Sequence, residues 1–430
     1  MSFPLTFDDN EYIEFLRILI ADTEKLQNGG GFVAQETLAA NHVIDRLRPY
    51  IDSGLIKCTK VEYVEGRANL ILEYGNSESG RTVTFAGSHF DCVPANPAMW
   101  NRNPFELVVE GDKLWGRATT DCLGHVALTT LILEKLAKNN VQLNYELIVI
   151  YIANEEDGRD TNIGAEHLLK DGYFEQSKNG CVYWLDASDV EPVRGSGSGL
   201  AWTLKVTGKK AHTGFVHQGI NPIPIAYEAM KAIIGKFNEL YPRTEKDDEY
   251  NYRCSANMKP TIMNTSPGNA ANQFPDFIEI TGDVRMPAYW NAFDMKVKIL
   301  EFAESLDLDS LPKLHEHFTT SCDESDTKVY AKMEFKWIFG PYCGIVTDVN
   351  SIGYKMIENA TLQHHPTCNA CSELGAIPLV KEMQDSGMDI QIIGYGNVEA
   401  YHANNEFCTL SGMKKGFNIL KSLLEIAQNK

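Results

Sequence analysis

Apolar and polar residues alternate along the first half of the chain in a pattern that predicts strands and helices in turn. Over residues 9–25 the apolar positions recur about every 3.6 residues, which predicts an amphipathic helix. Five short apolar runs then predict strands, and residues 123–136 between two of them predict a helix. The predicted strands are 61–64, 70–74, 82–87, 147–153 and 182–186. Strands that alternate with helices favour an α/β fold with a mostly parallel sheet covered on both faces.

The pattern changes at GSGSG, residues 195–199, which we interpret as a hinge. The following stretch mixes strands and helices without strict alternation, as α+β domains do. Its predicted elements are strands at 201–207, 258–263, 277–283 and 329–339 and helices at 222–240 and 292–306. From about residue 346 a helix, a strand at 390–395 and a final helix follow. We therefore predict a larger α/β domain, formed by 1–197 and 346–430, with a smaller α+β domain inserted at 198–345.

Composition and charge narrow the function classes. The chain has 430 residues, 43% of them hydrophobic, which suits two or three domains with a large core. A formal net charge of -19 argues against a nucleic-acid-binding protein. The beginning of the chain lacks the basic and apolar regions of a signal peptide, and no apolar run approaches the length of a membrane span. We expect a cytoplasmic protein that binds neither nucleic acid nor membrane.

The ten cysteines are scattered without the spacing of a disulfide framework, which is typical of reduced thiols in the cytosol. Cys368 and Cys371 form a single CxxC. This pair alone is also compatible with a zinc knuckle or a redox motif, although no second pair lies nearby.

Charged side chains follow the predicted strands where each strand ends. His89 and Asp91 lie in GSHFDCVP, directly after the strand at 82–87, and Glu155 and Glu156 in ANEED follow the strand at 147–153. An aspartate two residues after a histidine can accept the hydrogen bond of its second ring nitrogen. Each motif alone also has an ordinary explanation, because structural histidines occur at strand ends and paired glutamates occur on surface loops.

The same pattern recurs at three further positions. Asp121 precedes the predicted helix, where it could be a simple N-cap, Asp186 ends the strand at 182–186, and His402 follows the last strand. In α/β sheets ligands bind at the carboxyl ends of the strands. A site for two zinc ions needs imidazoles, terminal carboxylates and one bridging carboxylate, whereas a hydrophobic core needs none of these groups at its strand ends. The combination therefore predicts a two-metal site.

The order and spacing of these motifs resemble those of the co-catalytic zinc peptidase and deacylase family. The resemblance extends over nearly the whole chain. That family includes acetylornithine deacetylase, succinyl-diaminopimelate desuccinylase, aminoacylase and glutamate carboxypeptidase. The resemblance implies two Zn²⁺ ions, with Co²⁺ as a possible substitute. It implies that His89 and Asp186 hold one ion, that Glu156 and His402 hold the other, and that Asp121 bridges both. It further implies that Asp91 orients His89, that Glu155 is the general base, and that the Asp121–Cys122 peptide is cis.

The inserted domain resembles the lid of this family, which usually also forms a homodimer. The resemblance implies that His212, in GKKAHTG, reaches into the partner subunit's site and stabilises the oxyanion of the reaction. Asn272, in SPGNAANQFP, and Arg285, in GDVRMP, match positions that hold the substrate carboxylate, which an arginine fork binds well. Each also has an ordinary alternative, in which Arg285 is a surface strand residue and His212 a turn residue.

Within the family, the chain is most similar to the acetylornithine deacetylases of plants and related eukaryotes. Three stretches carry this similarity: ANPAMWNRNPFEL, GDKLWGRATTDCLGHVALTTLILEKL and GYGNVEAYHANNEF. They imply hydrolysis of N-acetyl-L-ornithine to L-ornithine and acetate, a step in arginine biosynthesis. A general aminoacylase and a metallo-dipeptidase on the same site remain alternatives. An inactive binding protein is a third, although the base and all five metal ligands are present. Ser88, Ala118 and Cys122 depart from the residues common in the family, but none removes a ligand.

Overall fold

The chain forms two compact units. The structure is a computed structural model that describes residues 2–157, 162–186, 190–314, 318–324, 327–369, 371–375, 377 and 379–430. The first unit comprises Met1–Arg194, Thr347–Cys371 and Pro378–Lys430, and the second comprises Gly195–Val346 and Ser372–Ile377. The segment Ser372–Ile377 thus belongs with the second unit, although it lies inside the range 346–430 that was expected to return to the larger domain.

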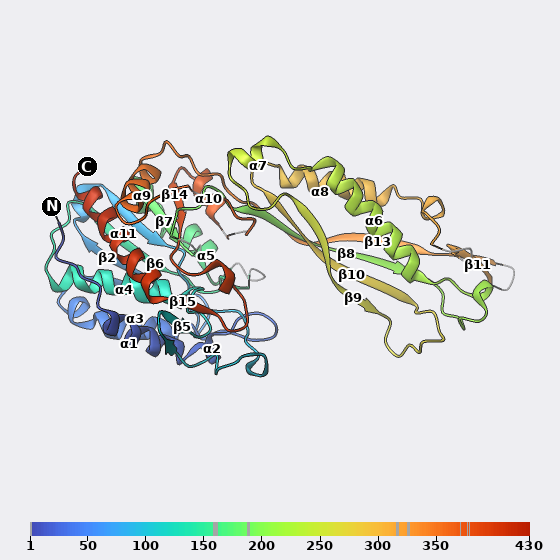
Figure 1. The fold of residues 1–430 in the computed structure, drawn as a ribbon, viewed down its shortest axis with the longest axis horizontal. Helices are drawn as coiled ribbons and strands as arrows, with labels where there is room; N and C mark the ends of the chain where they lie inside the picture. Colours follow the sequence, from blue (N-terminus) through green and yellow to red (C-terminus); the bar gives the residue numbers. More distant parts are fainter. Residues whose placement is uncertain are drawn as a thin grey trace. The chain divides into compact units, whose positions relative to one another are not determined.

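The first unit is built on a six-stranded sheet with the order β1-β2-β6-β3-β7-β14 (Figure 1). The strands are β1 (Lys57–Glu62), β2 (Ala68–Gly75), β3 (Thr82–Ala86), β6 (Glu146–Tyr151), β7 (Gly180–Leu185) and β14 (Asp389–Ile393). β6, β3, β7 and β14 pair in parallel, whereas β2 pairs antiparallel with both β1 and β6. The central strands are buried along almost their whole length, so both faces of the sheet are covered. This confirms the predicted α/β fold class.

The helix α4 (Leu123–Lys138) packs against three other helices of the first unit (Figure 1). These are α1 (Asp9–Ile20), α3 (Thr37–Asp52) and α11 (Leu410–Gln428). α4 is apolar on nearly all sides, as expected of a helix buried among others. The remaining elements of this unit are α2 (Thr23–Leu26), α5 (Ala165–Lys170), α9 (Ile352–Leu362), α10 (Val380–Asp385) and the small sheet of β4 (Val108–Glu110), β5 (Lys113–Trp115) and β15 (Phe407–Thr409).

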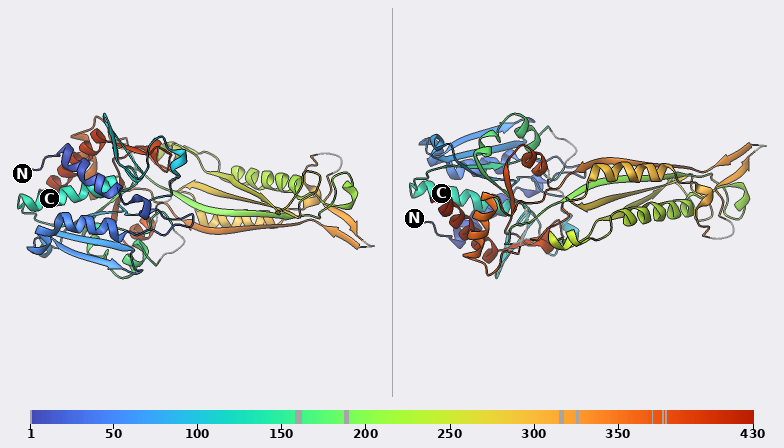
Figure 2. Two further views of the ribbon diagram at one scale, coloured as in Figure 1. Left: turned by 90° about the horizontal axis from the view of Figure 1, so that it is seen from below. Right: turned by 90° about the horizontal axis from the view of Figure 1, so that it is seen from above.

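The second unit is an antiparallel sheet with two helices on one face (Figure 2). Its strand order is β13 (Lys332–Tyr342), β8 (Gly197–Thr207), β10 (Phe277–Pro287) and β9 (Asn257–Thr265). The helices α6 (Pro222–Leu240) and α8 (Ala292–Glu304) cover alternate residues of β8 and β10, which form a separate core. Such alternation is typical of an antiparallel sheet with one covered face. The helix α7 (Glu245–Glu249) and the hairpin of β11 (Ser321–Glu324) and β12 (Thr327–Tyr330) complete the unit.

Three predicted elements differ in the structure. The continuous helix over 9–25 was wrong, because α1 ends at Ile20, whose carbonyl accepts the Thr23 hydroxyl at 2.7 Å, and α2 begins anew. The strand at 329–339 is divided, since β12 pairs with β11 while β13 pairs with β8. Residues 197–199 of the predicted hinge belong to β8, where they pair with residues 285–287 of β10. Among the described helices, none combines the length and apolar character needed to cross a membrane.

Candidate metal centre

The predicted metal-binding side chains follow the ends of neighbouring strands in the first unit. β3 leads into His89, β6 into Glu155 and Glu156, and β7 into Asp186. These strands are adjacent in the sheet in the order β6-β3-β7, and both of their pairings are parallel, so their carboxyl ends meet at one edge. Asp121 lies just before α4, and His402 lies between β14 and β15.

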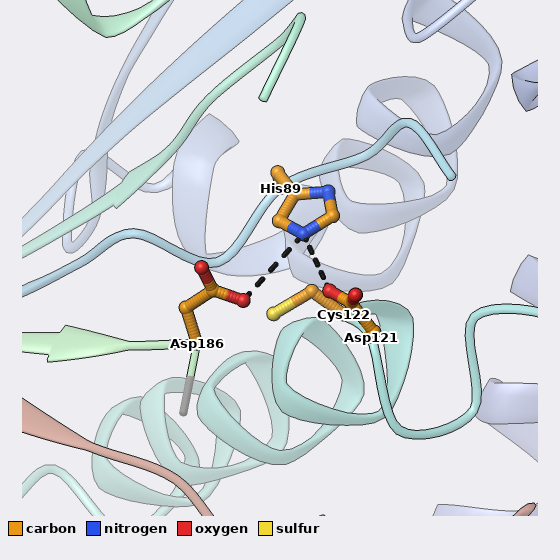
Figure 3. A group of neighbouring side chains, drawn as sticks. All are labelled: His89, Asp121, Cys122 and Asp186. Carbon is orange, nitrogen blue, oxygen red and sulfur yellow. Dashed lines mark hydrogen bonds and ion pairs between the residues drawn. The ribbon is translucent and has the colours of Figure 1, made fainter. Parts of the chain in front are cut away.

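Asp121 faces both histidines of the cluster. Its Oδ1 atom lies 2.9 Å from Nε2 of His89, and its Oδ2 atom lies 3.0 Å from Nε2 of His402. Oδ1 of Asp186 lies 3.7 Å from the same nitrogen of His89 (Figure 3). Oε2 of Glu156 lies 3.1 Å from Nε2 of His402. The five side chains therefore form two groups that share one carboxylate.

Asp91 orders the surroundings of this cluster. Its backbone carbonyl accepts a hydrogen bond from Nδ1 of His89 at 2.9 Å, so Nε2 of His89 is the nitrogen left to face the carboxylates. The Asp91 carboxylate, 3.3 Å from the same Nδ1, accepts the backbone N–H groups of Glu155 at 3.1 Å and Glu156 at 3.0 Å. The sequence predicted Asp91 beside His89, but its hold on the two glutamates was not foreseen.

Glu406 holds the loop that carries Asp121. Its buried carboxylate accepts the backbone N–H groups of Ala118 at 3.0 Å, Thr120 at 2.8 Å and Asp121 at 3.1 Å. Arg117 donates to it as well, at 2.7 Å. Ala118 has a φ of 68°, a left-handed conformation that glycine adopts more readily than alanine. The Asp121–Cys122 peptide is cis, as predicted.

The electrostatics of the cluster favour bound cations. Burial raises the pKa of Glu155 well above its usual value, and the nearby Asp186 carboxylate adds to this. Burial and Asp121 raise the pKa of Glu156 to about 7. Burial opposes a charge on His402, but hydrogen bonds to Asp121 and Glu156 outweigh it and raise its pKa to about 11. The carboxylates thus draw positive charge towards them, and imidazole nitrogens with carboxylate oxygens are donors that divalent zinc binds. The donor atoms of these residues lie close enough together to hold a metal ion, with His89, Asp121 and Asp186 buried and His402 exposed.

His125 has a structural role. It is fully buried in α4, and its Nε2 atom accepts the backbone N–H of Tyr395 at 2.8 Å. Burial lowers its pKa to about 4, so the ring is neutral at pH 7. This agrees with a role in helix packing and not with metal binding.

The other predicted site residues lie in the second unit. His212 forms a β-bridge with Gln273, and the N–H of Thr213 donates to the carbonyl of Asn272 at 3.0 Å, so His212 and Asn272 are on adjoining segments. Nδ1 of His212 accepts the N–H of Gly214 at 3.0 Å, which leaves Nε2 as the nitrogen that carries a hydrogen in the neutral ring.

Arg285 lies on β10, and its Nε atom donates to Asp283 at 2.8 Å. The structure therefore brings together the predicted residues of the first unit around Asp121, while His212, Asn272 and Arg285 belong to the second unit.

Two residues next to the cluster were missed from the sequence. The Tyr401 hydroxyl donates to Oδ1 of Asp186 at 3.1 Å. Cys122, noted only as a departure from the family, lies with its sulfur among His89, Asp121 and Asp186 (Figure 3). Both adjoin a predicted ligand in the sequence, and that adjacency was the only available signal.

The model of peptidase family M20/M25/M40 matches residues 85–426. The chain belongs to this family. Acetylornithine deacetylase of Dictyostelium discoideum is 33% identical over 98% of this chain and 97% of its own length. Acetylornithine deacetylase of Arabidopsis thaliana is 33% identical over 96% of this chain and 94% of its own. These findings confirm the predicted family and the predicted similarity to acetylornithine deacetylases. As a member of the M20 family, the protein is a hydrolase.

Solved structures agree on the M20 fold. Human carnosine dipeptidase 1 superposes with a TM-score of 0.74 at 14% identity, covering 98% of this chain and 97% of that chain. A Bacillus subtilis protein described as a dinuclear metal binding peptidase of the M20 family superposes with a TM-score of 0.58 at 16% identity, covering 98% and 99%. At these identities the likeness concerns the fold alone.

Proposed function

We propose that this protein is a two-zinc deacylase that hydrolyses N-acetyl-L-ornithine to L-ornithine and acetate, the step expected in arginine biosynthesis. The observation that carries the proposal is the Asp121 carboxylate, which offers one oxygen to His89 and the other to His402. Membership of the M20 family and the two deacetylase relatives support the reaction class and the substrate. A cytoplasmic location is supported by the ten scattered cysteines, whose spacing does not form a disulfide framework.

In this proposal His89 and Asp186 hold one Zn²⁺, Glu156 and His402 hold the other, and Asp121 bridges them. Co²⁺ is a plausible substitute because it accepts the same nitrogen and oxygen donors. Bound zinc lowers the pKa of a water molecule and polarises the carbonyl of the scissile amide. The Bacillus neighbour, whose description names a dinuclear metal site, supports the number of ions.

The remaining steps belong to the side chains of the protein. Glu155 takes a proton from the attacking water and returns it to the leaving nitrogen. Asp91 keeps this base in place through the Glu155 backbone N–H. His212 donates from Nε2 to the oxyanion, and Arg285 and Asn272 hold the substrate carboxylate.

We further propose that the protein is a homodimer in which the second unit of each chain serves the site of its partner. The exposed side chains of α6 and of the edge strand β9 support this. Ile223 and Tyr227 on α6 are 42% and 47% exposed, and Ile262 and Met263 on β9 are 52% and 57% exposed. An edge strand with unpaired backbone groups favours pairing with another chain.

Replacing His212 by alanine is expected to lower kcat by about 10²–10³-fold, because the oxyanion loses a hydrogen-bond donor. If His212 acts on the partner's site, mixing this variant with Glu155→Gln should restore activity, since one site of each mixed dimer then has both groups. The measurement is steady-state kinetics of the separate and the mixed proteins. Mixed dimers that form, as mass spectrometry can show, but recover no activity would refute action across the dimer.

The substrate is tested by comparing kcat/KM for N-acetyl-L-ornithine with that for N-acetyl-L-methionine and for unblocked dipeptides, before and after chelation. A preference for N-acetyl-L-ornithine that chelation abolishes supports the proposal. Metal-dependent turnover of N-acetyl-L-methionine or dipeptides alone would indicate a general aminoacylase or a dipeptidase. Bound metal without turnover of any of them would indicate a binding protein.

A further inference from the structure

A buried ion pair, Glu36 with Arg67, lies beside the turn that carries Glu155. Glu36 is 0% exposed and Arg67 is 4% exposed. Arg67 contacts both carboxylate oxygens, with Nη2 donating to Oε1 at 2.6 Å and Nε donating to Oε2. Removing two charges from water is costly, so a buried pair is weak evidence for a role in stability alone. The contacts of this pair indicate another role.

Both members of the pair bind Asn154, the residue directly before Glu155. Oε1 of Glu36 accepts the Asn154 backbone N–H at 3.2 Å, and Nη2 of Arg67 donates to Oδ1 of Asn154 at 3.2 Å. Asn154 has a φ of 60°, a left-handed backbone conformation that asparagine adopts more often than most residues. The pair therefore fixes both the backbone and the side chain of Asn154.

The contacts continue to the backbone of Glu155 itself. The side-chain amide of Asn28 donates to Oδ1 of Asn154 at 2.9 Å and to Oδ2 of Asp91 at 2.8 Å. Asp91 accepts the N–H of Glu155. An unbroken set of hydrogen bonds thus links the ion pair to Glu155.

We propose that Glu36 and Arg67 are positioning residues that set the backbone direction at Asn154 and thereby aim the Glu155 carboxylate. This inference rests on the proposed function, in which Glu155 is the general base. A displaced base slows proton transfer without weakening substrate binding, so loss of the pair lowers kcat and leaves KM unchanged.

The main test is the double variant Glu36→Gln/Arg67→Met, which removes both charges and leaves neither buried alone. We expect kcat to fall by at least about ten-fold, with KM and zinc content unchanged. In the metal-free protein, the Glu155 and Glu156 amides should exchange their hydrogens faster than in the unmodified protein. Arg67→Lys, which keeps the charge but not the two-pronged contact, should show the same effects more weakly, and it serves if the double variant fails to fold.

The matched control is Glu134→Gln/Arg46→Met, which removes an ion pair of 2.8 Å elsewhere in the first unit. It should change neither kcat nor the exchange of these two amides. In a Glu155→Gln background, loss of the Glu36–Arg67 pair should cause no further fall in kcat, because its effect passes through that carboxylate.

The proposal would be overturned if the folded Glu36→Gln/Arg67→Met variant kept its kcat or changed only in KM. An equal fall in kcat when the same two changes are made in the Glu155→Gln background would also overturn it. Absence of N-acetyl-L-ornithine hydrolysis in the unmodified protein would instead refute the proposed function. In that case the amide exchange still tests the positioning of the turn, since faster exchange supports it and unchanged exchange refutes it.

Discussion

Glu155→Gln is expected to lower kcat for N-acetyl-L-ornithine by about 10²–10⁴-fold, the range typical of losing a general base. The amide has nearly the same shape as the carboxylate but cannot accept the proton of the attacking water. The backbone N–H of Glu155 keeps its bond to Asp91, so the turn should be preserved. Zinc content should also be unchanged, because Glu155 is not among the proposed ligands.

The matched control is Glu146→Gln. Glu146 is 8% exposed and begins β6, the strand that leads to Glu155 at its other end. This variant tests whether loss of a buried carboxylate on the same strand suffices to slow the reaction, and its kcat should be close to normal. Near-normal kcat in Glu155→Gln would remove Glu155 from the mechanism.

Asp121→Asn is expected to weaken zinc binding by at least about 10²-fold and to abolish activity at limiting zinc. Changes to groups outside the ligand set already cost 10–100-fold in metal affinity, and a shared ligand should cost no less. The two oxygens of Asp121 face His89 and His402, and an asparagine would turn an NH₂ group towards one of them. Competition with a chelator measures the affinity, and elemental analysis gives the zinc content.

Asp112→Asn is a suitable control, because Asp112 binds the Ser411 hydroxyl and backbone outside the cluster. It should bind zinc normally. Two zinc ions held by Asp121→Asn with unaltered affinity would show that this carboxylate does not bridge.

The fold was predictable where the sequence pattern was strong. The predicted helix at 222–240 matches α6, and the five strand predictions before the hinge each overlap a strand of the main sheet. The helix α3 was missed, although its buried residues Ala39, Ala40, Val43 and Leu47 are spaced for a helix. The division between β12 and β13 could not be predicted, because it depends on which distant strand each half pairs with.

The site was predictable to the extent that its residues sit in strand-end motifs. His89, Asp121, Glu156, Asp186 and His402 converge in the structure, because the sheet brings the strand ends together. The residues that hold these side chains were not predictable. Glu36 and Arg67 lie far from Glu155 in the sequence, and only the tertiary structure joins them to Asn154. The assigned roles of all these residues remain predictions.

The most direct test of the two-zinc site is anomalous diffraction at the zinc edge from crystals of the zinc-loaded protein. We predict two zinc peaks per chain, with Asp121 between them, His89 and Asp186 on one, and Glu156 and His402 on the other. A single peak, or two peaks that do not share Asp121, would contradict the two-zinc centre.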